Sequence, residues 1–203
     1  MKDKIILSIL LVVAISVFTF GATYAYYFAS TTGNITGEVK SDLNTTLNVE
    51  TIYNASKLVP LDNSLIGTAI SKTTNKCIDK SGYEVCSLYK ITLTNTIDTE
   101  ILEGYVKTTS STYTTNNLKY QFYNSNLQPI TDIMTISPTK DEIVYFEQSG
   151  VQYSVTSVGT NTYYLAVWLT DTGSEQSADY SKTFAGKIGF KGEFEVLEDD
   201  FVA

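Results

Sequence analysis

The stretch YYLAVWL, residues 163–169, decides the fold. Successive side chains of a strand point to opposite faces, so a strand with one solvated face alternates apolar and polar residues. Here both the odd and the even positions are apolar, with Trp168 near the end of the run. We therefore predict that residues 163–169 form a central strand whose two faces are both covered.

Shorter runs on both sides of this stretch alternate with period two, which is typical of half-buried strands. Turn-forming clusters, such as TTNN at 114–117 and DTGS at 171–174, separate them. The 15 Tyr and the many Thr also favour strands. The pattern predicts an all-β fold, an antiparallel β-sandwich. The alternating runs are residues 47–53, 89–94, 102–107, 118–123 and 184–190, the last leading into Phe194 and Val196.

One segment, residues 61–72, favours a helix. Asp62 or Asn63 is placed to cap its first turn. Apolar residues then recur at i, i+4 spacing, at Leu65, Ile66, Ala69 and Ile70. The segment is predicted to be either one short helix or an ordered loop.

The N-terminal residues predict export. Lys2 and Lys4 precede an uncharged apolar run over residues 5–20, the basic-then-apolar order of a secretory signal. Thr23 and Ala25 are small enough for the −3 and −1 positions of a cleavage site. We therefore expect residues 1–25 to be a signal peptide.

The expected cut lies between Ala25 and Tyr26. The competing prediction is an uncleaved anchor, because residues 21–28 extend the apolar run to the length that a bilayer requires. In both cases residues 26–203 are predicted to form one domain outside the cytoplasmic membrane, secreted or at the cell surface. Contact with the membrane is expected only through the N-terminal segment.

The two cysteines agree with an oxidising location. Cys77 and Cys86 enclose eight residues that include DKSG at 79–82, a strong turn signal. Strand ends joined by such a turn come close enough for a disulfide, which persists outside the cell. The alternative is a pair of reduced buried thiols. A metal site needs further ligands that this chain, having no histidine, supplies poorly.

Composition excludes several functions. The chain has 14 basic residues, all lysines, against 22 acidic ones, a formal net charge of −8 and no histidine. Without imidazole there is no Ser-His-Asp triad and no H-E-x-x-H zinc helix. An acidic chain without arginine also repels nucleic acid. We expect neither an enzyme nor a nucleic-acid partner, and no cofactor or metal.

Three features, in their order along the chain, resemble a known family. GATYAYYF at 21–28 closes the apolar signal and is followed by a strand region; VWL at 167–169 and FAGKIGF at 184–190 come late. Together they resemble the secreted TasA and camelysin-like proteins of Gram-positive bacteria. The resemblance implies a jelly-roll domain, processing by a dedicated signal peptidase and, by similarity to TasA, assembly into biofilm matrix fibres.

Two points depart from that family. Some of its members are labelled metallopeptidases, but this chain offers neither a His ligand nor an H-E-x-x-H helix for that activity. The predicted disulfide loop and the modest length also differ from the fibre-forming type. Polymerisation in the same manner is therefore an open question for this chain.

The segment after the expected cut is a candidate donor strand. Three aromatic residues, Tyr26, Tyr27 and Phe28, stand at the new N-terminus, where leaving them in water is costly. A free strand can complete the sheet of a neighbouring subunit and so build fibres. The alternative is that residues 26–39 are simply the first strand of their own sheet.

Other candidate sites have plain explanations. Asp171, Glu175 and Asp179 share one segment and have oxygen ligands suited to calcium, but a solvated loop is favoured because no EF-hand order appears. The run EDD at 198–200 is expected to be a solvated tail. Sequons at Asn34, Asn44 and Asn54 are expected by chance in a chain rich in Asn and Thr.

The sequence thus favours a structural function. The preferred hypothesis is a secreted cell-surface protein, a subunit or accessory of an extracellular matrix fibre, whose partners are copies of itself or a matrix protein. The alternative is a surface glycan-binding module, because sandwiches often present aromatic rows to sugars and this chain is rich in tyrosine.

Overall fold

A single bent strand, β2 (Ser87–Ser111), takes part in both sheets of the molecule. The computed structural model describes residues 45–192 and 196–202, and the expected signal, cleavage site and donor segment lie outside them. The first half of β2 pairs with β1 (Thr45–Tyr53) on one side and with β8 (Ser154–Leu169) on the other. The second half pairs with β9 (Phe184–Lys191) and β5 (Ile143–Tyr145).

A bulge at the bend lets β2 pass from one sheet to the other. Its register against β8 shifts between Asn95 and Glu100. Opposite Asn95 stands Gly159, whose φ of 69° is in the left-handed region that favours glycine. Bulges of this kind turn strands at the corners of sandwiches.

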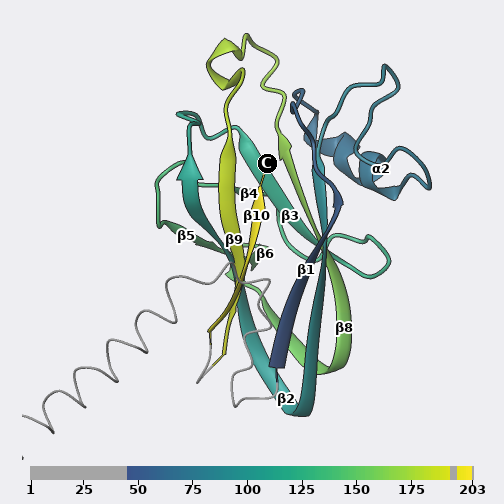
Figure 1. Ribbon diagram of the computed structural model, residues 1–203, viewed down its shortest axis with the longest axis vertical. Helices are drawn as coiled ribbons and strands as arrows, with labels where there is room; N and C mark the ends of the chain where they lie inside the picture. The colour runs from purple at the N-terminus through teal and green to yellow at the C-terminus, as the bar shows by residue number, and fades with distance from the viewer. Residues whose placement is uncertain (1–44, 193–195, 203) are drawn as a thin grey trace, which may run out of the picture. The chain divides into compact units, whose positions relative to one another are not determined.

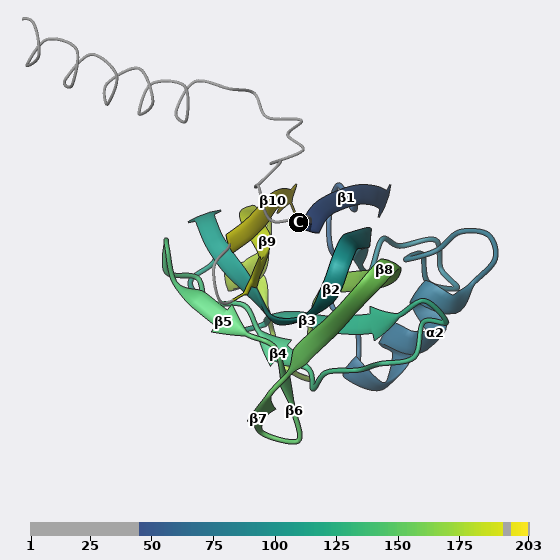
Figure 2. The ribbon, with the colours of Figure 1, turned by 90° about the horizontal axis from the view of Figure 1, so that it is seen from below.

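Two antiparallel sheets result, and they lie face to face as a sandwich (Figures 1 and 2). One has the order β1-β2-β8-β3-β4, and the other has the order β10-β9-β2-β5. The predicted antiparallel β-sandwich is confirmed. The remaining strands are β3 (Leu118–Asn124), β4 (Met134–Thr135), β10 (Val196–Val202) and a small hairpin of β6 (Glu147–Gln148) and β7 (Val151–Gln152).

The main core fills the space between the sheets. It is largely aromatic, and the ring of Phe146 lies 4.6 Å from that of Phe122 between ring centroids. Gly104 is needed beneath Phe146, because a Cβ there would come within 2.3 Å of the ring. From the central strand, Leu165, Val167 and Leu169 point into this core.

A second apolar cluster covers the outer face of the same strand. Ala166 and Trp168 belong to it, and Trp168 has no exposed surface. The prediction that residues 163–169 are covered on both faces is therefore confirmed. Each face buries a separate set of apolar side chains, which stabilises this strand from both sides.

The cover is a helical turn and a disulfide loop. Helix α2 (Ile66–Ser71) follows the 3₁₀ turn η1 (Asn63–Leu65), whose first N–H groups are capped by Asp62: its Oδ1 accepts from Ser64 N at 2.8 Å. The predicted Cys77–Cys86 disulfide is present, and both cysteines are fully buried. The indole Nε1 of Trp168 donates to Asn63 Oδ1 at 2.9 Å, which joins this cover to the sheet.

Three sequence predictions need correction. Residues 89–94 and 102–107 belong to one continuous strand, because a bulge turns β2 where separate strands were expected. β3 is covered on both faces, since Tyr123 lies beneath the second cluster. Residues 198–200 are not a solvated tail but the middle of β10, where Glu198 pairs with Lys187 at 3.4 Å.

No helix in the described ranges is long and apolar enough to cross a membrane.

Candidate functional site

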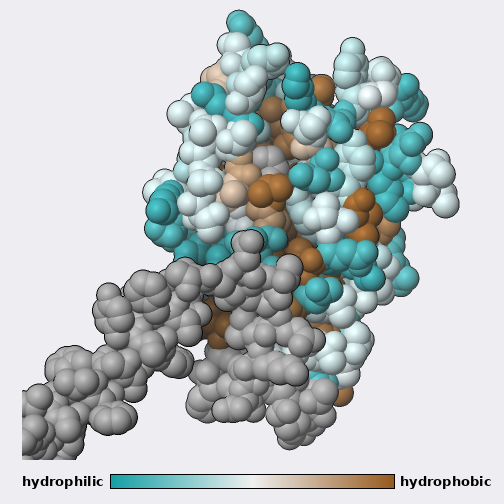
Figure 3. Space-filling model, viewed as in Figure 1, coloured by the Kyte–Doolittle hydropathy of each residue, from teal (hydrophilic) through white to brown (hydrophobic). Residues whose placement is uncertain are grey.

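Strands β1 and β10 lie side by side without a hydrogen-bonded ladder between them (Figures 1 and 2). In the described part of the chain, β1 pairs only with β2, and β10 pairs only with β9. We call the line where the two edges face each other the seam. Figure 3 shows apolar surface along this line between polar flanks.

One carboxylate joins the two edges. Val49 N of β1 donates to Asp199 Oδ2 of β10 at 3.0 Å, and Asp199 Oδ1 accepts from Asp200 N at 2.8 Å. Asp199 lies between Leu197 and Phe201, which are both buried in the main core, so its side chain points inward. A charged group aimed inward at a free edge is a known protection against edge pairing.

The hydrogen bond of Val49 fixes the direction of the other backbone groups in β1. In an antiparallel ladder a residue points its N–H and C=O to the same side, and alternate residues point to opposite sides. Because Val49 donates away from β2, Leu47 and Thr51 direct their backbone groups to the seam as well. No described strand pairs with them there.

The seam is also tied at its upper end. Tyr89 of β2 donates its hydroxyl to the carbonyl of Val202, and its ring lies 5.3 Å from that of Phe201 between centroids. Burial raises the pKa of Tyr89, so the hydroxyl keeps its proton as a donor at all ordinary pH values. On the side that faces β1, β10 is therefore held by two side chains, while its other side keeps the ladder with β9.

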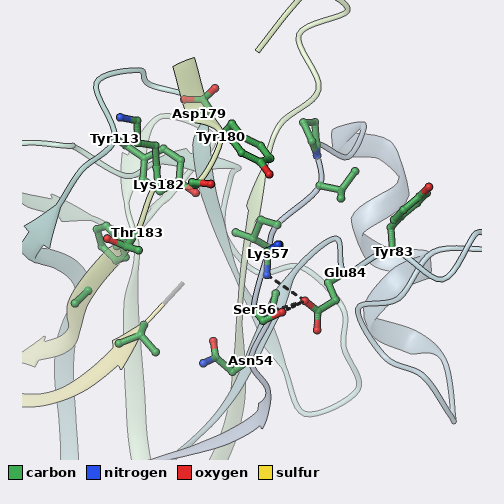
Figure 4. A pocket seen from close by; sticks show the side chains of 18 of the residues that line it. Asn54, Ser56, Lys57, Tyr83, Glu84, Tyr113, Asp179, Tyr180, Lys182 and Thr183 are labelled. Carbon is green, nitrogen blue, oxygen red and sulfur yellow. Dashed lines mark hydrogen bonds between the residues drawn. The ribbon is translucent and has the colours of Figure 1, made fainter. Parts of the chain in front are cut away.

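Above the seam lies an open groove of about 880 Å³ (Figure 4). One wall is the segment after β1, residues 54–60, which we call the strap. The other wall is residues 179–185, between the 3₁₀ turn η2 (Ser177–Asp179) and the start of β9. Val202 at the end of β10 lies at its base.

Glu84, from the disulfide loop, holds the strap. Its carboxylate accepts four hydrogen bonds: from the hydroxyls of Tyr53 and Ser56, both at 2.7 Å, and from the backbone N–H groups of Ser56 at 2.9 Å and Lys57 at 3.1 Å. The bonds from Ser56 and Tyr53 lower the pKa of Glu84 to about 2. The carboxylate is thus ionised at any ordinary pH, and it ties the strap to the loop closed by Cys86.

Four backbone N–H groups of the strap are donated within the protein. Ala55 N donates to Ser87 Oγ at 3.1 Å, and Val59 N donates to Glu84 O at 2.8 Å. With Ser56 and Lys57 bound to the Glu84 side chain, four donors of the strap are occupied. Pro60 has none. The strap therefore offers side chains to the groove, not an open strand edge.

Asp179 anchors the opposite wall. It is only 4% exposed, and its carboxylate accepts from the Thr115 hydroxyl, from Asn117 Nδ2 at 2.8 Å and from Gln176 Nε2 at 3.4 Å. The expected solvated loop is thus wrong for this residue, which ties its own loop to the loop that holds Thr115 and Asn117.

The other acidic residues of this segment show no ligand site. Asp171 accepts from Gly173 N at 2.8 Å in an exposed turn, and Glu175 is exposed. The described residues contain no group of three or more residues arranged to hold a metal ion.

The groove is lined by two lysines and two carboxylates. Lys57 lies on the strap and Lys182 on the opposite wall, and neither takes part in an ion pair with another described residue. Both carboxylates at the groove, Glu84 and Asp179, are already bound within the protein. Tyr180, which belongs to the wall of residues 179–185, is 74% exposed (Figure 4).

Sequence reasoning located some of these residues and missed others. It found Cys77 and Cys86. Asn54 was noted only as a chance sequon, and the structure locates it at the groove, where its Oδ1 accepts from Ser87 Oγ at 3.3 Å. It missed Asp199 and Glu84. The alternation of Leu197, Asp199 and Phe201 was a usable signal, since it puts the carboxylate on the apolar face of a strand.

The predicted cleavage site at Ala25 and Tyr26, and the candidate donor residues Tyr26, Tyr27 and Phe28, lie outside the described residues. Comparison with known protein families finds no matching family model, and comparison with curated proteins finds no match. The seam and the groove are therefore the features of the described chain that bear on its function.

Proposed function

We propose that this chain is a secreted structural protein of the cell surface, a subunit or accessory of an extracellular matrix fibre, that assembles by adding a strand from a neighbouring copy at the seam. It acts through its shape and its edges, without a reactive centre. The observation that carries the proposal is the pair of facing edges, β1 and β10, between which the described part of the chain has no strand ladder and which the Asp199 side chain joins.

The location is supported by two independent features. The buried Cys77–Cys86 disulfide is compatible with an oxidising, extracellular environment. The basic and then apolar order of residues 2–20 is that of a secretory signal. The resemblance to TasA and camelysin-like proteins points to the same setting.

The seam suits strand addition because its backbone groups are not used by a described strand. Leu47 and Thr51 point theirs outward, and an added strand would pair with them through main-chain hydrogen bonds. Entry requires the Asp199 side chain to leave Val49. That step costs about 1.5–3 kcal/mol, because the bond that breaks is made to a carboxylate in a part-buried position.

The donor is the segment with Tyr26, Tyr27 and Phe28. Three adjacent aromatic side chains gain more by burial in a neighbour than by exposure to water, at roughly 1.5–3 kcal/mol for each fully buried large apolar side chain. Because each chain supplies both a donor strand and an acceptor edge, neighbouring copies join head to tail. Such contacts build open filaments unless the rotation from one copy to the next closes a ring.

The test uses the exported protein, with its first residue fixed by N-terminal sequencing. Electron microscopy and light scattering are followed over a concentration series. We expect filaments or growing oligomers. A protein that stays monomeric at every concentration contradicts the proposal.

Two variants test the parts separately. Thr51→Pro removes an N–H that faces the seam while leaving the β1–β2 ladder intact, since proline is tolerated on edge strands. It is expected to block assembly, whereas Thr51→Ala, which keeps the N–H, assembles normally. The triple change of Tyr26, Tyr27 and Phe28 to Ala is expected to reduce assembly, with Tyr83→Ala, at an exposed tyrosine, as control. Equal assembly of Thr51→Pro and Thr51→Ala would rule out the seam.

A further inference from the structure

We infer that the strand which completes the seam runs antiparallel to both β1 and β10, that it places a hydroxyl side chain against Asp199, and that residues 28–32 of a second copy supply it. The inference rests on the proposed function, because it names the segment, the direction and the side-chain contact of the strand addition proposed above. The direction, the backbone groups and the central carboxylate of the two edges support it.

β1 and β10 run in the same direction along the seam (Figure 1). At one level, Val49 of β1 is bound to Asp199 of β10. Two residues further along β1, Thr51 pairs with Tyr89 of β2, whose ring lies 5.3 Å from that of Phe201 between centroids. Moving forward along β1 is therefore also moving forward along β10.

A strand between two such edges is antiparallel to both or parallel to both. The antiparallel arrangement is favoured, because antiparallel pairing is slightly more stable per residue. Every strand ladder in the described part of the chain is also antiparallel. The entering strand therefore begins beside Thr51 and Phe201 and ends beside Leu47 and Leu197.

The backbone groups of the two edges suit a single strand. On β1, the groups that face the seam belong to Val49 and its alternate neighbours, whose side chains point to the core side. On β10, Asp200 N donates to Asp199 and the Val202 carbonyl accepts from Tyr89, so the seam is faced by residues with outward side chains. Successive residues of a strand direct their backbone groups to opposite sides. The inward residues of one entering strand thus serve β1, and its outward residues serve β10.

The Asp199 carboxylate binds the groups that this strand would use. Its Oδ2 accepts from Val49 N at 3.0 Å and its Oδ1 accepts from Asp200 N at 2.8 Å, one N–H group from each edge. Carbonyl groups of an entering strand replace it and leave the carboxylate without these donors. Asp199 then lies opposite an inward residue in a non-hydrogen-bonded pair, where side chains are closest. A hydroxyl there donates to the carboxylate, whereas a second carboxylate is repelled.

Residues 28–32 of a second copy, FASTT, meet these requirements. With the hydroxyl of Ser30 opposite Asp199, the ring of Phe28 lies beside Phe201, and cross-strand aromatic pairs are stabilising. A shift of one residue turns Phe28 outward. A shift of two residues puts the phenyl ring against the carboxylate, which then has no donor.

The other alternating run before β1, residues 35–39 (ITGEV), fits less well. Its central inward residue is Gly37, which has no side chain to donate to Asp199. Its outward Glu38 would lie beside β10, where Glu198 and Asp200 also face outward. Like charges on neighbouring strands are destabilising. The outward positions of residues 28–32 are uncharged.

The experiment measures the direction of a synthetic peptide in the seam. A peptide of residues 26–34 carries a nitroxide at its N-terminus or its C-terminus, and it is added to the exported full-length chain below the concentration of assembly. Broadening of backbone amide signals is read for each label. We expect the N-terminal label to broaden Asn54 and Val202, and the C-terminal label to broaden Thr46 and Val196. The reverse pattern means parallel entry and would overturn the inference.

A charge exchange tests the contact with Asp199. A Ser30→Asp peptide is expected to bind about tenfold more weakly than the unchanged peptide, because two carboxylates then face each other. A Ser30→Thr peptide keeps the hydroxyl and should bind normally. The Asp199→Asn chain should bind the Ser30→Asp peptide as well as the unchanged one. Equal binding of both peptides to the unchanged chain, or no recovery with Asp199→Asn, places residue 30 elsewhere and overturns the inference.

Failure of the proposed function has a different signature. An exported chain that stays monomeric at every concentration and binds no peptide contradicts the proposed function itself. A chain that forms filaments but does not bind the peptide overturns only the assignment of residues 28–32 as the entering strand.

Discussion

β1 and the strap are consecutive segments of one chain, yet they use their backbone in opposite ways. In β1, Leu47 and Thr51 point their N–H groups outward to the seam, where no described strand takes them. In the strap, Ser56 and Lys57 donate theirs to the Glu84 carboxylate. The first segment directs backbone groups to an edge that no described strand pairs with, whereas the second has donated four of its N–H groups within the protein.

The difference arises from what lies beside each segment. The strap has a neighbour in the disulfide loop, and Cys86 fixes Glu84 at the place where free N–H groups need an acceptor. β1 has β10 beside it, and β10 offers one carboxylate, Asp199, instead of a ladder. The comparison leads to four predictions about variants, taken from the largest expected effect to the smallest.

Trp168→Ala is expected to destabilise the second apolar cluster, which lies beneath the disulfide loop that holds the strap. Trp168 is fully buried beneath the disulfide loop and α2, and truncation of such a side chain costs about 3–5 kcal/mol. Chemical denaturation measures the loss. Trp168→Phe keeps most of the buried area and loses the bond to Asn63, so it should cost only about 1–2 kcal/mol. Equal losses in the two variants would contradict this account.

Changing Cys77 and Cys86 together to Ser is expected to cost somewhat less than about 3 kcal/mol, because the closed loop is short. The local effect is more informative. Hydrogen exchange at Ser56 and Lys57 should accelerate, since Glu84 is no longer held in place, while exchange at Leu47 stays unchanged. Uniform acceleration along both segments would show that they are not independent.

Glu84→Gln is expected to cost about 1–2 kcal/mol at neutral pH, because charge-assisted bonds to the strap are weakened. The pKa of Glu84 is about 2 in the folded protein, and near 4.3 in an unfolded chain. Its contribution is therefore complete above about pH 5 and is lost as pH falls toward 2. Melting curves of the two proteins should converge over that interval. A constant gap down to pH 2 would contradict the assignment.

Asp199→Ala is expected to have the smallest effect on stability, about 1 kcal/mol, because the lost bond to Val49 is partly offset by the removal of a carboxylate from the inward face of the strand. Its effect on assembly should be larger, with filaments forming at lower concentration, since the edge of β1 is no longer blocked. Asp200→Ala, on the exposed side of the same strand, is the control. Slower assembly of Asp199→Ala than of Asp200→Ala would mean that the carboxylate promotes pairing instead of preventing it.

The sequence predicted the strands in which the order of apolar and polar residues follows from burial alone. Period-two alternation identified β1, β3 and β9, and apolar residues on both parities identified the centre of β8. The disulfide also followed from local signals, whereas the same kind of signal left residues 61–72 as either a helix or a loop, of which α2 occupies Ile66–Ser71. These features depend on side chains near one another in the chain, which a sequence displays directly.

The candidate site was less predictable because its contacts join distant residues. Val49 and Asp199 are separated by 150 positions, and Tyr53 meets Glu84 across 31. An acidic run such as residues 198–200 looks solvated in the sequence, since charge normally indicates exposure. The pairing of β10 with β9 establishes that this run lies in a strand, and the alternation with Leu197 and Phe201 then puts Asp199 on the inward face.

Residue-by-residue hydrogen exchange on the unassembled protein tests the contrast between β1 and the strap most directly. The account predicts slow exchange at Ala55, Ser56, Lys57 and Val59, and fast exchange at Leu47 and Thr51 relative to Asn48 and Glu50, which face β2. Leu47 and Thr51 protected as strongly as Asn48 and Glu50, or a strap that exchanges freely, would contradict it.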